Sequence, residues 1–378
     1  MKIGIVLHPY GEDQPAGLAR TIFELTKGML AVDSENEYVI FLKHKPRVMP
    51  ELPGVNWKVY ILGEGLMWLR RLKKGPVCDV TVFNTPVLPL FYKPKNAVVL
   101  ALDFAYYYFP PAGFKARMLN WFTFWYHKRS LGRADSIVAI SEATKKDMVH
   151  LFGIAPEKIH VVLCGFKDVC KITEKEIRLP EKFFLFVGVM KERKNVFNVV
   201  RAFAAISKKY SEYMLVLGGR AEGAYVEEMK RYIREQGIES RVQFIGHLND
   251  GELSYVYRRA YALVFASFIE GFGYPVLEAM ACGTPVVTSQ STSLGEICQN
   301  NSALLVDPAR VDEIAGAMER MITQPNLREE LIRNGREQAK KFSWEKAGRE
   351  MVEILNQAVP SAVIPAKAGI QGNQTEMK

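Results

Sequence analysis

Two glutamates eight residues apart, Glu270 and Glu278, enclose a turn that is rich in glycine. Gly271 and Gly273 allow unusual backbone angles and let a ligand approach the main chain closely. Pro275 suits the first turn of a helix, where its missing N–H group costs nothing. Such a helix start offers unpaired N–H groups and a partial positive charge, which favour a phosphate. We therefore expect backbone donors for a diphosphate and two carboxylates that accept hydrogen bonds from sugar hydroxyl groups. The alternative is an ordinary capped helix with acids near its start.

A basic pair, Arg193 and Lys194, follows another apolar run and precedes an apolar helical face. A nucleoside diphosphate that leaves a sugar develops negative charge, and cations held at that point stabilise it. Charge-assisted hydrogen bonds of this kind are worth about 1.5–3 kcal/mol each. We expect both side chains to contact a diphosphate, and the alternative is a solvated basic helix start.

The elements that must position these residues alternate between short apolar runs and amphipathic helical stretches. This alternation predicts an α/β fold with two parallel sheets, each covered by helices on both faces. In such doubly wound folds, ligands bind outside the carboxyl ends of the strands, where both segments lie. The expected strands are 2–7, 38–42, 55–62, 77–84, 97–103, 135–141 and 159–165 in the first sheet, and 183–190, 213–219, 242–248, 262–268, 285–290 and 303–308 in the second.

The alternation of apolar runs and helical stretches is interrupted by the polar segment 165–182, which we interpret as a linker. The expected domains are therefore 1–168 and 182–342, facing each other across a cleft. A helix at 343–358 is expected to pack back toward the first domain. The tail at 360–378 lacks periodicity and is expected to be disordered.

Composition and missing motifs exclude several classes of protein. The chain has 378 residues, of which 48% are hydrophobic and 24% charged, as expected for a folded protein with two cores. We expect neither a signal peptide nor a membrane span. The five cysteines lack a CxxC spacing and are predicted to be reduced thiols rather than a disulfide framework or a zinc site. No HExxH, GxSxG, Walker or Asp-x-Asp sequence occurs, so we expect neither a metal nor a cofactor.

The segment 270–278 resembles the signature of the retaining, two-domain glycosyltransferases of family 4, in which seven residues separate two glutamates. The similarity continues through 279–287 to Gly295 and Glu296, and covers about 186–307 well and the first domain weakly. It implies the GT-B fold, in which two Rossmann-like domains face a cleft. It also implies that Glu270 hydrogen-bonds the donor sugar and Glu278 the ribose, while Arg193 and Lys194 match the phosphate-binding loop.

The same resemblance implies further site residues. Asp103 is expected at the reacting centre, or as a structural cap after its strand. Leu102 stands where the family commonly has a histidine that contacts the transferred sugar, and a donor without a 6-hydroxyl group is one explanation. The glycine loop at 16–20 has fewer glycines than is usual, and Arg20 is a further candidate there. The donor-binding positions are Gly17, Gly188, Gly218, Gly219, Ile245, Gly246, Gly271, Phe272, Gly273, Tyr274, Pro275 and Glu278.

The activity implied is a metal-independent, retaining transfer of a hexose, with a nucleotide sugar as co-substrate. The departing phosphate oxygen would help to deprotonate the acceptor hydroxyl group, so no protein base is required. The second domain looks most like bacterial mannosyltransferases, which makes GDP-mannose the first expected donor and a UDP-sugar the second. The acceptor would be a glycan or lipid-linked acceptor of cell-surface polysaccharide synthesis. The alternatives are a catalytically weakened nucleotide-sugar-binding subunit and a sugar-nucleotide epimerase of the same fold.

The net charge of +9 fits an anionic substrate, an anionic membrane surface or a plain basic surface. The segment 114–133 interleaves basic and aromatic residues, which suits a peripheral membrane contact. The alternative is that its aromatic residues are buried against the sheet. No nucleic-acid partner is expected. The expected location is the cytoplasm, either free or peripheral at the inner face of the membrane.

Overall fold

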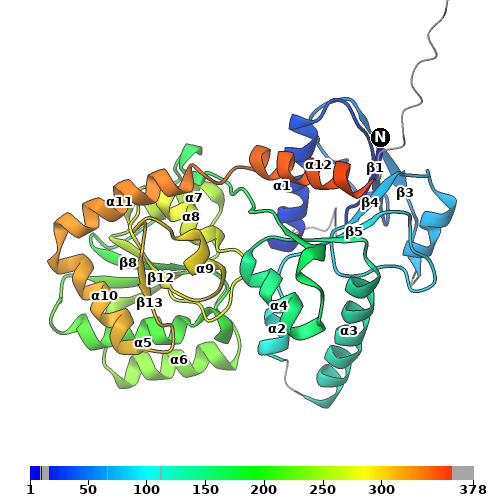
Figure 1. Ribbon diagram of the computed structural model, residues 1–378. Coiled ribbons are helices and arrows are strands. Elements are labelled where there is room, and N and C mark those ends of the chain that lie inside the picture. Colours follow the sequence, from blue (N-terminus) through cyan, green and yellow to red (C-terminus); the bar gives the residue numbers. More distant parts are fainter. Residues whose placement is uncertain (9, 11–16, 66, 111–112, 360–378) are drawn as a thin grey trace, which may run out of the picture.

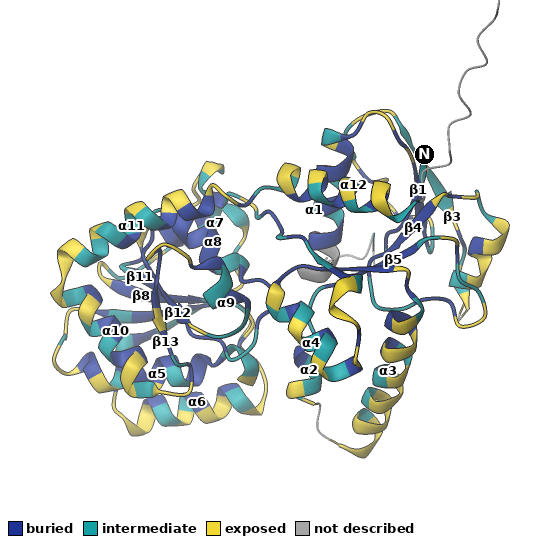
Figure 2. Ribbon diagram, viewed as in Figure 1, coloured by how far each residue is buried: buried dark blue, intermediate teal, exposed yellow. Residues whose placement is uncertain are grey.

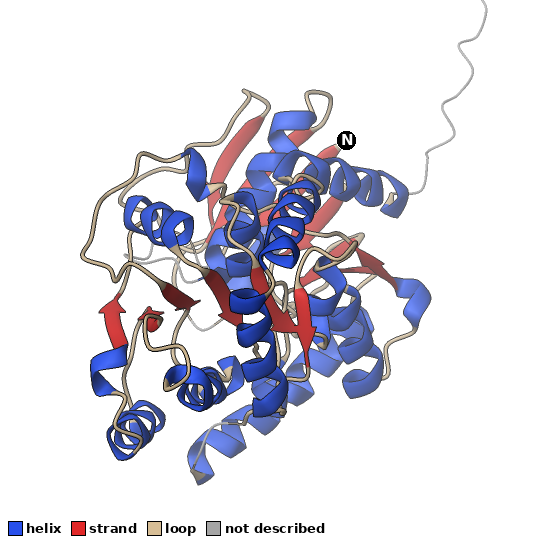
Figure 3. Ribbon diagram, turned by 90° about the vertical axis from the view of Figure 1, so that its left-hand side faces the viewer, coloured by secondary structure: helices blue, strands red, loops and turns tan. Residues whose placement is uncertain are grey.

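The computed structural model describes residues 1–359 except 9, 11–16, 66 and 111–112, and of 17–20 it describes only the helical backbone. Two α/β domains lie next to each other, the first blue to teal and the second green to orange (Figure 1). In a view in which the second domain lies in front of the first, strands lie between surrounding helices (Figure 3).

The first domain is built on a seven-stranded parallel sheet in the order β3-β2-β1-β4-β5-β6-β7. Its inner strands β4, β5 and β6 are buried at every position, because helices cover both faces of the sheet. Its elements are β1 (Lys2–Val6), α1 (Gly17–Val32), β2 (Glu37–Leu42), β3 (Trp57–Ile61), η1 (Trp68–Lys74), β4 (Val80–Phe83), β5 (Ala97–Ala101), α2 (Ala105–Tyr108), α3 (Phe114–Arg133), β6 (Ser136–Ala139), α4 (Glu142–Phe152), η2 (Pro156–Lys158), β7 (Ile159–Val161) and η3 (Val169–Lys171).

The second domain is built on a six-stranded parallel sheet in the order β10-β9-β8-β11-β12-β13. Its elements are β8 (Phe183–Val187), η4 (Glu192–Lys194), α5 (Val196–Ser207), β9 (Met214–Gly218), α6 (Ala224–Glu235), η5 (Glu239–Arg241), β10 (Val242–Gly246), α7 (Asp250–Arg259), β11 (Ala262–Phe265), α8 (Tyr274–Ala281), β12 (Val286–Ser289), α9 (Thr292–Ile297), β13 (Leu304–Val306), α10 (Val311–Thr323), α11 (Pro325–Ala339) and α12 (Trp344–Ala358).

The strand order of both sheets reverses beside the first strand of each domain, between β1 and β4 and between β8 and β11. Connections leave these paired strands in opposite directions, and the gap at their carboxyl ends is where doubly wound folds bind ligands. Every strand expected from the sequence overlaps an observed strand, so the predicted fold class is confirmed.

The last helix, α12, leaves the second domain and lies against α1 of the first (Figure 1). Glycines permit this close packing. A Cβ on Gly28 would lie 2.1 Å from the carbonyl oxygen of Trp344, and a Cβ on Gly348 would lie 2.3 Å from the carbonyl carbon of Gly28. The chain therefore passes between the domains twice, once before β8 and once before α12.

The linker is tied to the second domain by a disulfide. Cys170 of η3 and Cys282, which follows α8, are bonded with their Cα atoms 5.4 Å apart. The prediction that all five cysteines are reduced thiols was therefore wrong for this pair, because only the packing of η3 against α8 brings residues 112 positions apart together. Cys78, Cys164 and Cys298 are free and buried.

Helix α3 divides its aromatic residues between two environments, so burial against the domain describes only some of them. Phe124 packs on Tyr107, with ring centroids 5.2 Å apart, and the Tyr126 hydroxyl group donates to the carbonyl oxygen of Leu88. Other aromatic and apolar side chains are exposed, and Figure 2 shows much of α3 in yellow. The exposed ones are Phe114, Met118, Leu119, Trp121, Phe122 and Trp125. None of the described helices is long and apolar enough to span a bilayer.

Candidate active site

The carboxyl ends of β8 and β11 bring Arg193, Lys194 and Glu270 together. The Lys194 ammonium group donates to both carboxylate oxygens of Glu270, at 2.5 and 2.6 Å. Arg193 Nη1 lies 3.6 Å from Glu270 Oε2 and donates to the carbonyl oxygen of Ile269. The sequence named all three residues, and the structure shows that two cations share one carboxylate.

The backbone between β8 and α5 fixes the direction of this basic pair. Asn195 adopts a left-handed conformation with φ 54°, which asparagine tolerates better than most residues. Its side-chain amide donates to the carbonyl oxygens of Ala266 and Pro308, at 2.8 and 2.6 Å. The N–H group of Phe268 donates to the carbonyl oxygen of Arg193. The loops after β8 and β11 are therefore fastened to each other on both sides of Lys194.

Burial makes this ion pair electrostatically important. The side chains of Lys194 and Glu270 are only 15% and 7% exposed. Burial lowers the pKa of Lys194, and the Glu270 carboxylate opposes that shift. The charge of Asp103, from the first domain, also raises the pKa of Lys194, so the two domains share one electrostatic field here.

Glu278 lies in the first turns of α8, which begins as the sequence indicated. Gly273 precedes the helix with φ 114°, and proline occupies the first turn at Pro275. The carboxylate of Glu278 is buried and accepts a hydrogen bond from the Tyr257 hydroxyl group at 3.1 Å. Burial first, and the Glu278 charge second, raise the pKa of Tyr257. Tyr257, on α7, has no sequence signal of its own.

Four glycines form one surface at the ends of β8, β9 and β10. The N–H group of Gly188 donates to the carbonyl oxygen of Gly218, and that of Gly219 donates to the carbonyl oxygen of Gly246. A Cβ on Gly219 would lie 2.1 Å from the carbonyl oxygen of Gly188. Any larger residue at Gly219 would therefore separate these strand ends.

Three further candidate donor-binding side chains lie in different environments. Phe272 is buried and packs on Tyr274 and Phe342. The Tyr274 hydroxyl group is 2.7 Å from Thr21 Oγ1 on α1, so this side chain contacts the first domain. Ile245 is half-buried at the edge of the second sheet.

The first domain reaches this site through the end of β5. A Cβ on Gly271 would lie 2.5 Å from the carbonyl oxygen of Leu102 and 2.9 Å from Asp103 Cβ. Asp103 accepts a hydrogen bond from the N–H group of Ala105, so it has the structural role considered above and also lies at the interdomain contact. Ser293 Oγ donates to the carbonyl oxygen of Glu270 and so holds the loop against α9.

Glu296 forms an interdomain contact that the sequence did not indicate. It lies on α9, yet its carboxylate accepts hydrogen bonds from the N–H groups of Glu142 and Ala143, at 2.8 and 3.3 Å. These groups begin α4 of the first domain, and a carboxylate at a helix N-terminus is stabilising. Ser293 and Glu296 therefore connect the Glu270 loop to the opposite domain through one short helix.

Some predicted positions lie outside the described residues. Helix α1 begins at Gly17, and the side chain of Arg20 lies outside the described residues, as does most of the preceding loop. The tail at 360–378 also lies outside them.

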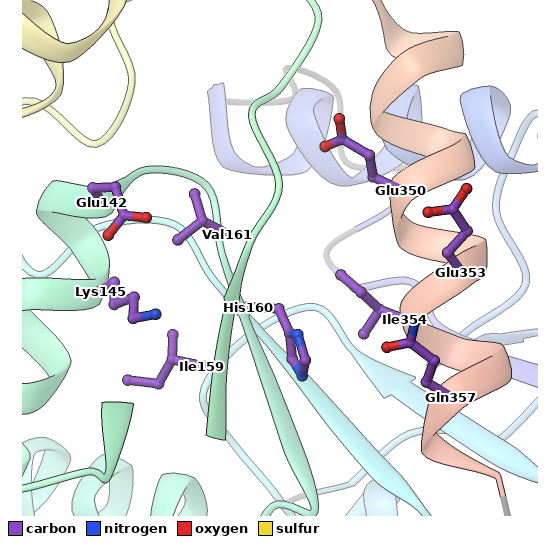
Figure 4. A pocket seen from close by; sticks show the side chains of 9 residues that line it. All are labelled: Glu142, Lys145, Ile159, His160, Val161, Glu350, Glu353, Ile354 and Gln357. Atoms are coloured by element: carbon purple, nitrogen blue, oxygen red, sulfur yellow. The ribbon is translucent and has the colours of Figure 1, made fainter. Parts of the chain in front are cut away.

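A separate pocket of about 440 Å³ lies on the first domain between α4, β7 and α12. Figure 4 shows His160 of β7 next to Ile354 and Gln357 of α12, with Glu350 and Glu353 further along that helix. No residue expected to bind the donor lines this pocket. Within the described ranges, no three His, Cys, Asp or Glu side chains gather in a way that could hold a metal ion.

Comparison with known proteins identifies the family. Residues 17–168 match the family described as Glycosyltransferase Family 4, and residues 171–338 match Glycosyl transferases group 1. The chain belongs to glycosyltransferase family 4. One relative is O-antigen chain mannosyltransferase B of Escherichia coli, 29% identical over 234 residues, which are 59% of this chain and 61% of that protein. Another is MMP alpha-(1->4)-mannosyltransferase of Mycolicibacterium hassiacum, 29% identical over 236 residues, which are 61% of this chain and 56% of that protein. The matches thus span less than two thirds of these relatives.

Solved structures share the fold of this family 4 chain. Sucrose-phosphate synthase from Thermosynechococcus elongatus superposes with a TM-score of 0.74 at 20% identity, over 94% of this chain and 98% of that one. Anabaena HepE in complex with UDP-glucose gives a TM-score of 0.71 at 17% identity, over 94% of this chain and 100% of that one. These likenesses confirm the GT-B arrangement of two Rossmann-like domains.

Proposed function

We propose that this chain transfers a hexose from a nucleotide-diphosphate sugar to a hydroxyl group of a glycan or lipid-linked acceptor, with retention of the anomeric configuration. The observation that carries the proposal is the partly buried cluster of Arg193, Lys194 and Glu270 at the switch point of the second sheet. Family membership and the position of Glu278 support it.

The cluster has the charges that such a transfer needs. Without donor, Lys194 and Arg193 are held by the carboxylate of Glu270. A diphosphate that enters beside them offers these cations a second anionic partner, and they stabilise the negative charge of the leaving group as the bond to the sugar breaks. Glu270 can then accept hydrogen bonds from the hydroxyl groups of the sugar, which is the role that the family resemblance implies.

The second carboxylate is suited to a different part of the donor. Glu278 lies about one turn along α8 and is oriented by Tyr257. We assign it to the ribose hydroxyl groups, while the N-terminus of α8 and the glycines after β8 and β9 face the diphosphate. Retention follows if a departing phosphate oxygen takes the acceptor proton on the same face of the sugar.

The relatives direct the choice of donor and acceptor. Two of them are named as mannosyltransferases, one of an O-antigen chain, which favours GDP-mannose before a UDP-sugar. Cell-surface polysaccharide synthesis is the process that this choice implies. The transfer is proposed to need neither a metal nor a cofactor.

A thermal-shift screen with GDP, UDP, dTDP and ADP, each alone and with its sugars, tests donor binding, because a ligand of the native state raises the melting temperature. Release of nucleoside diphosphate then measures turnover. We expect Glu270→Gln to slow turnover about a hundredfold, by the usual effect of losing one polar contact to the transition state. Unchanged turnover, or the absence of any nucleotide-induced shift, contradicts the proposal.

Product analysis separates the alternatives. An epimerase would change a nucleotide sugar without an acceptor, and a binding subunit would bind donor without turnover across acceptors. For a retaining transferase, NMR of the product should show the anomeric configuration of the donor.

A peripheral membrane contact through α3 is part of the proposal. Its exposed aromatic residues, such as Trp121 and Trp125, accompany the exposed Lys115, Arg117, Lys128 and Arg129. Sedimentation with anionic vesicles should recover the chain, and Trp121→Ala with Trp125→Ala should reduce recovery, whereas Leu305→Ala on the second domain should not. Equal sedimentation with neutral and anionic vesicles would contradict the proposed membrane contact.

A further inference from the structure

A cavity of about 790 Å³ opens in the first domain at the carboxyl ends of β4 and β5. One wall is the loop 84–87, another is the end of β5 at Leu102 and Asp103, and α3 closes the third side. The volume is sufficient for a sugar ring with part of its neighbouring residue.

This cavity adjoins the proposed donor site directly. Leu102 and Asp103 line it, and the same two residues leave no room for a Cβ on Gly271, the neighbour of Glu270 in the chain. The cavity therefore lies on the first-domain side of the contact with the loop that carries Glu270, the residue that we assign to the donor sugar.

His127, on α3, and Asn84 are buried polar residues of the cavity wall. The hydroxyl groups of Tyr106 and Tyr107 both lie close to the Nδ1 atom of His127, at 2.9 and 3.0 Å. No hydrogen-bond partner for Nε2 occurs among the described residues. Burial lowers the pKa of His127 to about 4, so the ring is neutral at pH 7. A neutral imidazole has one donor and one acceptor nitrogen, which suits a sugar hydroxyl group.

The charges of the lining restrict what can bind. Its other polar side chains include Thr85, Asn120 and Thr123, and Asp103 is acidic. Among the described lining residues there is no lysine or arginine. A phosphate or carboxylate in the cavity would thus lose water next to Asp103 and meet no lysine or arginine among the described lining residues, which is unfavourable.

We infer that this cavity binds the acceptor through an uncharged sugar ring, that His127 hydrogen-bonds a hydroxyl group of this ring, and that acceptors phosphorylated on the ring are excluded. The inference rests on the proposed function for the identity of the neighbouring site. The apolar lining of Val87, Leu102 and Leu119 suits the C–H face of a sugar ring.

Saturation-transfer NMR on the full chain tests this inference, with methyl glycosides of common neutral hexoses and the corresponding hexose phosphates as probes at millimolar concentration. We expect signals from at least one neutral glycoside and no competition from the phosphates. Thr123→Trp fills the cavity and should abolish the signal, whereas Thr123→Ala at the same position should retain it.

His127 is tested by two substitutions. His127→Phe keeps the ring volume but removes the hydrogen bond, and should weaken glycoside binding about tenfold, the effect of one net hydrogen bond. His127→Gln restores a donor and an acceptor, and should recover part of the loss. Melting temperature and nucleotide affinity, measured for each variant, separate a loss of folding from a loss of acceptor binding.

Three outcomes would overturn the inference: no neutral glycoside binds, Thr123→Trp leaves the signal intact, or hexose phosphates bind as well as the glycosides. A chain that binds glycosides in this cavity but no nucleotide would leave the inference standing and refute the proposed function instead.

Discussion

The Lys194–Glu270 ion pair permits a quantitative test by a double-mutant cycle. Lys194→Met removes two charge-assisted hydrogen bonds, at 2.5 and 2.6 Å, and leaves a carboxylate that is 7% exposed. Removing one partner of a buried pair costs about 3–5 kcal/mol. Arg193, 3.6 Å from the same carboxylate, still compensates part of the charge, so we expect a loss of about 3 kcal/mol.

The double variant Lys194→Met with Glu270→Gln removes both charges of the pair. Only Arg193, whose side chain is 28% exposed, then loses its carboxylate, so the double variant should lose only about 1 kcal/mol relative to the wild-type chain. Calorimetry of the second domain measures these differences. A loss of about 3 kcal/mol corresponds to a fall of about 6–12 °C in melting temperature for a domain of this size.

Lys191→Met is the matched control, since Lys191 is exposed and close in sequence, and surface substitutions usually change stability by less than about 0.5 kcal/mol. If the losses of the two single variants add within about 0.5 kcal/mol in the double variant, the pair is not coupled and the reasoning fails.

Three further predictions concern other contacts. Tyr257→Phe removes the hydrogen bond to Glu278 and should weaken nucleotide binding about fivefold, the effect of about 1 kcal/mol; calorimetric titration would contradict this if the affinity were unchanged. Gly271→Ala places a Cβ 2.5 Å from the carbonyl oxygen of Leu102, so the domains must separate locally, and the transfer rate should fall about a hundredfold; a wild-type rate would show that this contact is dispensable. His127 is neutral when native down to about pH 4, whereas in the unfolded chain it takes up a proton below about pH 6.5. The free energy of unfolding should therefore decrease by up to about 3 kcal/mol as the pH falls from 6.5 to 4, because only the unfolded chain takes up this proton. Urea titrations should show a shallower pH dependence for His127→Gln.

The fold was predictable because its signal is local. Strands that are buried on both faces, such as β5 and β11, must be short apolar runs, and their order along the chain fixes the two parallel sheets. The predicted ends of the strands differ from the observed ends by a few residues. The position of Glu270 after β11 followed from the same pattern.

The half of the candidate site that lies in one contiguous segment was also predictable. Gly271, Gly273 and Pro275 have backbone requirements that the sequence displays. Partners that come from other elements were not predictable. Tyr257 reaches Glu278 from α7, and Glu296 reaches α4 from the opposite domain, so both contacts depend on packing and leave no pattern along the chain.

The cavity beside His127 illustrates the same limit. The sequence placed His127 on a basic, aromatic helix but could not separate its inward from its outward side chains. Tyr106 and Tyr107 meet His127 only because α2 and α3 fold against each other. The disulfide between Cys170 and Cys282 was missed for the same reason.

The ion pair of Lys194 and Glu270 is complete before any ligand arrives, and this has a consequence for the end of a reaction cycle. Under the proposed function, Glu270 loses its hydroxyl partners when the transferred sugar leaves and again attracts Lys194, which would then still hold the diphosphate product. The carboxylate would therefore compete with the product for the same cation and accelerate its release. A chain with Glu270→Gln lacks this competitor and should retain nucleoside diphosphate longer, so product inhibition, measured against donor concentration, should become stronger in that variant.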